Sequence, residues 1–63
     1  VGHPVMRLNR MLRRAKNQEH VIIKFNLDDL PVEAVEILVK RHGFVVDRKE
    51  MEDRACILYC SRV

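Results

Sequence analysis

The chain has 63 residues, of which 12 are Lys or Arg and nine are Asp or Glu, giving a formal net charge of +3. A chain this short is expected to fold as one small domain over residues 1–63, and it buries only about 60% of the surface that its unfolded state exposes. Because no run of 18 apolar residues and no signal-peptide pattern occurs, we expect an intracellular protein, cytoplasmic or nuclear, that makes no contact with a membrane.

The positive charge is concentrated at the start of the chain. Residues 1–20 carry five cations and one acid, a net charge of +4, whereas residues 21–63 carry seven cations and eight acids, a net charge of −1. Apolar residues recur there every three or four positions, which predicts a helix that begins at Pro4 and leads into a polar exit at Asn17. The apolar face consists of Val5, Leu8, Met11, Leu12 and Ala15. The candidate binding residues are the cations away from that face: Arg7, Arg10, Arg13, Arg14 and Lys16.

The next stretch, HVIIKFN at residues 20–26, is rich in β-branched and aromatic residues and predicts a strand. Val21, Ile23 and Phe25 share one face of it, and Ile22 and Lys24 share the other. We expect the first face to pack on the core and the second to point outward.

The segment LDDLPVEAVEILVKRHG, residues 27–43, predicts a second helix. Asp29 is its expected N-cap, Pro31 lies in its first turn, and Gly43 stands where a left-handed C-terminal cap is needed. Glu36 precedes Lys40 by four residues, which is the favourable order for an ion pair. Because most of its remaining surface is apolar, we expect this to be the more buried helix.

The segments FVVDRK (44–49) and ACILYCS (55–61) predict two further strands, joined through the acidic turn EMED (50–53). The last strand is apolar on both faces, which favours a central position in the sheet. Cys56, Leu58 and Cys60 share one face, and Ile57 and Tyr59 share the other. The two cysteines stand roughly 13 Å apart along the strand, too far for a disulfide, so we interpret them as buried thiols.

The order α-β-α-β-β predicts an α+β fold, a two-layer α/β sandwich in which a three-stranded sheet carries both helices on one face. With a right-handed crossover, the first two strands run parallel and the third lies antiparallel between them. The sequence shows no internal repeat or low-complexity segment.

From IKFNLDDL through KRHG to DRACILYCS, residues 23–61, the chain resembles the single-stranded nucleic-acid-binding domains named for an Arg and a His separated by three residues. In that family a helix, a strand, a second helix ending at a Gly, and a closing hairpin follow in this order. The resemblance implies the fold. Alignment on Gly43 puts Val32 at the position of the signature Arg and Glu36 at that of the signature His, so no binding residue is carried over.

No pattern favours catalysis, a cofactor or a metal. Asp28 and Asp29 are explained by capping of the second helix, and His42 by the dipole at its C-terminus. Cys-His chemistry would need a base beside Cys56 or Cys60, and the spacing supplies none. The three histidines are scattered, and no Cys-x2-Cys pair accompanies them. We therefore expect neither an enzyme nor a binder of cofactors, metals or small-molecule substrates.

Two functional interpretations use different surfaces. Cations on one rigid helix are suited to the phosphates of an RNA or DNA backbone, although plain solvation or an acidic protein partner explains the same charges. Stacking groups are scarce, since Tyr59 is the only obvious exposed aromatic candidate. The alternative is a protein–protein interaction or homodimer through an apolar patch on the outer face of the sheet. That patch would consist of Ile22, Val45, Ile57 and Tyr59. The leading hypothesis is a nucleic-acid-binding module with little base specificity.

Overall fold

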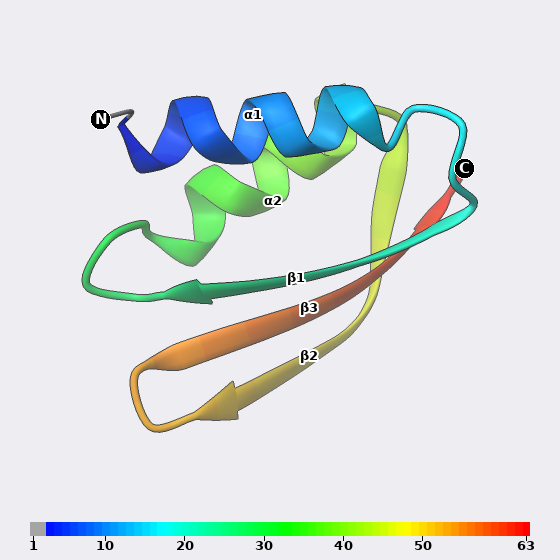
Figure 1. Ribbon diagram of the computed structural model, residues 1–63. Coiled ribbons are helices and arrows are strands. Elements are labelled where there is room, and N and C mark those ends of the chain that lie inside the picture. Colours follow the sequence, from blue (N-terminus) through cyan, green and yellow to red (C-terminus); the bar gives the residue numbers. More distant parts are fainter. Residues whose placement is uncertain (1–2) are drawn as a thin grey trace.

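The computed structural model describes residues 3–63. Two helices and three strands follow one another in the order α-β-α-β-β, and both helices cover the same face of the sheet (Figure 1). The elements are α1 (Pro4–Arg14), β1 (His20–Asn26), α2 (Val32–Arg41), β2 (Phe44–Glu52) and β3 (Ala55–Arg62). This architecture confirms the predicted α+β fold with two layers. Within residues 3–63, neither helix has the length and apolar character needed to cross a bilayer.

The central strand of the sheet is β3, as the strand order is β1-β3-β2. It pairs antiparallel with both neighbours, so β1 and β2 run parallel to each other, as predicted. Cys56, Leu58 and Cys60 are at most 2% exposed, whereas Ile57 and Tyr59 are half-buried on the opposite face. The predicted alternation of this strand is therefore confirmed, and its two apolar faces account for its central place.

The core lies between the sheet and the two helices and contains ten buried apolar side chains of the described residues. They are Leu8, Leu12, Ile23, Leu30, Val35, Val39, Phe44, Cys56, Leu58 and Cys60. Four of the ten residues of α2 are exposed, against six of the eleven of α1, so α2 is the more buried helix, as predicted. Gly43, with φ of +84°, ends α2 in the left-handed conformation expected of it.

A bulge in β2 changes which of its side chains point outward. The register with β3 shifts between Val46 and Arg48, which leaves Asp47 as an extra residue. Beyond the bulge, Arg48 lies opposite Tyr59, and both Arg48 and Glu50 lie on the outer face of the sheet. A regular strand would have directed these two side chains toward the helices.

The same bulge redirects the expected ion pair of α2. Lys49 turns toward the helices, and its Nζ lies 3.6 Å from Oε2 of Glu36. The predicted pair between Glu36 and Lys40 is wrong, because the carboxylate faces Lys49, which regular alternation would have placed on the outer face.

The hairpin between β2 and β3 is tighter than predicted. β2 continues to Glu52, which lies opposite Ala55, so the turn consists of Asp53 and Arg54 alone. The prediction of an acidic turn at residues 50–53 is wrong, because pairing with β3 draws the first three of these residues into the strand. Asp53 has φ of 55°, a left-handed conformation that Asp adopts more readily than most residues.

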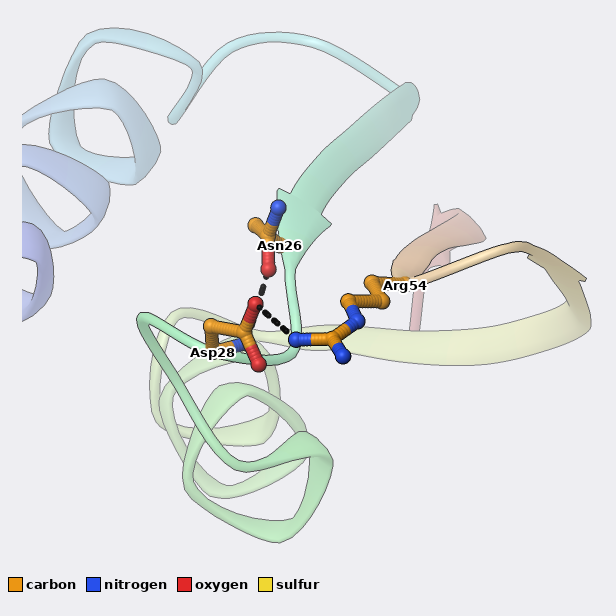
Figure 2. A network of polar contacts seen from close by, with 3 residues as sticks. All are labelled: Asn26, Asp28 and Arg54. Carbon is orange, nitrogen blue, oxygen red and sulfur yellow. Dashed lines mark hydrogen bonds and ion pairs between the residues drawn. The ribbon is translucent and has the colours of Figure 1, made fainter.

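The turn that leads from β1 into α2 is held by a small polar network (Figure 2). Oδ1 of Asn26 accepts a hydrogen bond of 2.8 Å from the N–H of Asp28, and the carboxylate of Asp28 pairs with Arg54 at 3.0 Å. The N-cap of α2 is Pro31, which makes no side-chain cap bond. The prediction of Asp29 as the N-cap is therefore wrong, because the Asn26 turn takes up residues 27–30 before the helix begins.

Both thiols are free and buried. Burial raises the pKa of the Cys56 thiol, with Lys49 acting against it, and burial followed by the nearby Asp47 raises the pKa of the Cys60 thiol. Only a thiolate reacts rapidly with alkylating agents. We expect iodoacetamide to modify both thiols slowly in the folded protein and rapidly in denaturant, which mass spectrometry can count. Modification of the folded protein at the rate of an unfolded chain would contradict this burial.

Candidate polyanion interface

His3 and Pro4, the two residues before Val5, form the N-terminal end of α1. Nδ1 of His3, the N-cap, accepts a hydrogen bond of 3.2 Å from the N–H of Val5, and Pro4 occupies the first turn. Leu8 and Leu12 are the two buried residues of this helix, and they anchor it to the core. The side of α1 opposite these leucines points away from the sheet.

The structure leaves all five predicted cations exposed and brings four of them onto α1. The four are Arg7, Arg10, Arg13 and Arg14. Lys16 lies beyond the helix, in the turn toward β1, so the prediction that one rigid element carries all five is wrong for this residue. The helix ends early because the N–H of Ala15 is shared between the carbonyls of Met11 and Leu12, at 3.1 and 3.2 Å, which tightens the last turn.

The charge of these five cations is not neutralised by the described part of the protein. The ion pairs that the structure shows there join other residues: Arg48 with Glu50, Lys49 with Glu36, and Arg54 with Asp28. Arg13 and Arg14 lie in the last turn of α1, where the helix dipole favours cations. The positive face is thus compatible with a stable helix and remains available to an external anion.

The arginines divide between two flanks of α1. Arg7 lines an open groove of about 420 Å³ between α1 and β1, whose floor includes Leu8 and Ile23. Lys24 of β1 also borders this groove. Its register opposite Ile57 directs its side chain to the outer face of the sheet, as the sequence predicted. Arg10 lies with Arg13 at a smaller hollow of about 200 Å³ on the flank of Met6 and Asn9.

Two contacts from distant parts of the chain fix the position of α1. Nε2 of His42, at the end of α2, lies 2.7 Å from Oδ1 of Asn9. Arg62, at the end of β3, donates hydrogen bonds of 3.0 Å to the carbonyls of Ala15 and Gln18. The second contact places a guanidinium at the C-terminal end of α1, where carbonyl groups lack helical partners. Nothing in the local sequence pattern indicated the role of Arg62.

The candidate stacking residue does not lie with the arginines. Tyr59 alternates along β3 with the buried Leu58 and Cys60, so it lies on the outer face of the sheet. Helix α1 covers the inner face (Figure 1). The guanidinium of Arg48 lies over the Tyr59 ring at 4.3 Å from its centroid, and the Tyr59 hydroxyl donates to Glu50 at 3.0 Å. A base held near α1 is therefore out of reach of this ring, and contacts of α1 with a nucleic acid would involve mainly the backbone.

Two residues considered as catalytic or metal-binding candidates from the sequence contact other side chains of the fold. Asp28 pairs with Arg54, and His42 is bonded to Asn9. Among residues 3–63, no three His, Cys, Asp or Glu side chains converge in a group that could hold a metal ion.

Comparison with protein-family models, curated protein sequences and solved structures finds no match for this chain. The resemblance to the Arg-xxx-His domains therefore stays a prediction. At its two signature positions, Val32 packs against the core and Glu36 pairs with Lys49, so α2 offers no cation there.

Proposed function

We propose that this protein is a small non-catalytic binding module whose helix α1 contacts a polyanion, with RNA or DNA backbone as the preferred class. The observation that supports this function is the set of five exposed cations on and just after α1, none of which is paired with an acid of the described chain. A helix face that is only solvated does not need such an excess of positive charge. Residues 21–63 carry a net charge of only −1, so the positive charge is specific to the region of α1.

The spacing of the arginines is suited to a phosphate backbone. Arg7 and Arg14 are seven residues apart, which corresponds to roughly 10 Å along a helix axis. One strand of a duplex presents a phosphate about every 3.4 Å along its axis, so α1 spans about three of them. Arg10 lies between the two along the axis, on the flank that it shares with Arg13, and Lys16 lies past the end of the helix.

The contacts would carry little sequence information. Guanidinium and ammonium groups bind phosphates in any sequence, whereas base recognition needs contacts to base edges or stacking on aromatic rings. Tyr59 lies on the opposite face, and Phe25, which packs against the core, is only half-exposed beside the groove. We therefore expect similar affinities for unrelated sequences of equal length.

A salt titration of binding tests this function. With a duplex oligonucleotide, the logarithm of the affinity should fall linearly with the logarithm of the salt concentration, with a slope of about −3 to −5 if four or five cations each neutralise a phosphate. Single-stranded DNA of the same length should give a shallower slope. Poly-glutamate serves as a competitor. Displacement of the duplex by poly-glutamate at an equal concentration of charge would indicate an acidic protein partner, and a slope near zero would contradict the proposal.

A further inference from the structure

The outer face of the sheet, opposite the helices, has an ordered pattern of charge. On β3, Ile57 lies opposite Lys24 of β1 on one side and opposite Glu50 of β2 on the other. The acid Glu52 follows on the same face of β2, at the end that pairs with Ala55. This face is thus apolar along its centre, with the cation Lys24 on its β1 side. On its β2 side it carries the acids Glu50 and Glu52, and Arg48 lies beside Glu50.

The centre of the face is partly open to solvent. Ile22 is 64% exposed and lies opposite Tyr59, which is itself next to Ile57 on the same face. Val45 is 39% exposed at the end of β2 before the bulge. The predicted patch is therefore present as a continuous strip, but Arg48 and Glu50 border it on the β2 side. A partner for this surface needs an apolar centre and charges that oppose Lys24 and Glu50.

A second copy of the chain meets these requirements in one orientation. A two-fold axis parallel to β3, placed between two facing sheets, stacks β3 on β3 and brings the β1 side of each copy over the β2 side of its partner. Lys24 of each copy then faces Glu50, with Glu52 beside it. An axis perpendicular to the strands would instead stack β1 on β1 and put Lys24 against Lys24, which is unfavourable.

We propose that the protein self-associates through this sheet face as a two-fold symmetric dimer with its axis parallel to β3. Ile57 and Tyr59 pack on their symmetry mates at the centre, and two Lys24–Glu50 pairs flank them. The interface is isologous, so each substitution acts twice. Both α1 helices remain on the outside of the dimer, because they cover the other face of each sheet. The proposal is therefore independent of polyanion binding.

The dimer is expected to be weak. Three strands about 4.8 Å apart and about seven residues long give a face of roughly 14 by 23 Å. This is less than half of the ~800 Å² that each partner contributes to a standard stable interface. We expect a dissociation constant between about 10 µM and 1 mM, which sedimentation equilibrium resolves.

A charge-reversal pair tests the orientation as well as the dimer. In Lys24→Glu two acids face each other at each flanking pair, and in Glu50→Lys two lysines do, so each variant should dimerise about tenfold more weakly than the parent. An equimolar mixture of the two variants allows heterodimers in which both flanking pairs are attractive. One pair joins the native Lys24 to the native Glu50, and the other joins the two substituted residues, whose charges are exchanged. Across the heterodimer the acids and lysines balance, and we expect it to form more readily than either variant homodimer. No polyanion is present, so the result does not depend on the function of α1.

Two further variants keep this test decisive. Glu50→Lys also removes the contacts of Glu50 with Arg48 and Tyr59. Glu52 makes no ion pair within residues 3–63, so Glu52→Lys replaces Glu50→Lys in the mixture if the first variant unfolds. Lys40→Glu, exposed on α2, is the matched control because it makes the same charge change away from the proposed interface. It should dimerise as tightly as the parent, and its mixture with either reversed acid should associate less than Lys40→Glu alone. A parent that stays monomeric up to about 1 mM, or variants whose mixture associates no better than each alone, would overturn the proposal.

Discussion

Replacing Arg7, Arg10 and Arg14 together with Gln is expected to lower the affinity for a duplex oligonucleotide by roughly 30- to 100-fold near 0.1 M salt and to flatten its salt slope by about three. Each of these side chains is exposed and makes no ion pair with an acid of residues 3–63, so each is able to contact one phosphate and release its counterions. Gln keeps good helix propensity, and the loss of stability should stay below about 1 kcal/mol. Fluorescence anisotropy at several salt concentrations measures affinity and slope, and circular dichroism checks the fold.

The control must separate a contact surface from the effect of net charge. Lys40 and Arg41 are also exposed cations, and they lie at the end of α2. The double variant Lys40→Gln with Arg41→Gln removes the same charge as Arg10→Gln with Arg14→Gln. We expect the α2 pair to change the affinity less than about twofold and the α1 pair to change it about tenfold or more. Equal losses from the two pairs would show that only the overall charge matters, and that α1 is not the contact surface.

The basic face was predictable because helical periodicity and charge are both local properties of the sequence. The spacing of Leu8 and Leu12 set the buried side of α1, and the positions of the four arginines follow from it. The sequence placed Lys16 on the helix, but α1 ends two residues before it, at Arg14. There the N–H of Ala15 is shared between two carbonyls. The boundaries of elements depend on such end contacts more than on periodicity.

The order of the strands was predictable for a similar reason, whereas the outer face of the sheet was not. The two apolar faces of ACILYC indicated a central strand. The bulge at Asp47, however, arises from how β2 fits against β3, and no pattern in FVVDRK marks it. It moved Arg48 and Glu50 to the outer face, where they contact Tyr59. The sequence predicted an apolar patch on the outer face, whereas the structure shows an apolar strip with charged residues beside it. The positions of these charged residues are the basis of the proposed dimer orientation.

Contacts between distant residues were beyond sequence reasoning altogether, and Arg62 is the clearest case. Its two carbonyl partners lie 47 and 44 residues earlier in the chain. Its guanidinium also lies over the ring of Phe44, 4.4 Å from the centroid, close to the left-handed Gly43. One side chain thus joins the end of α1, the turn before β1 and the core at the start of β2.

Replacing Arg62 with Ala is expected to lower the free energy of unfolding by about 2 kcal/mol, from the loss of two charge-assisted hydrogen bonds and one cation–π contact, each partly screened by solvent. A domain of this size has a total stability of only about 3–9 kcal/mol, so the urea midpoint should fall markedly. Arg62→Lys is the matched control. It keeps the charge near the helix end but has no planar fork to reach both carbonyls, so it should recover about half of the loss. A midpoint unchanged in Arg62→Ala would show that these contacts do not stabilise the fold, and full recovery in Arg62→Lys would show that charge alone suffices.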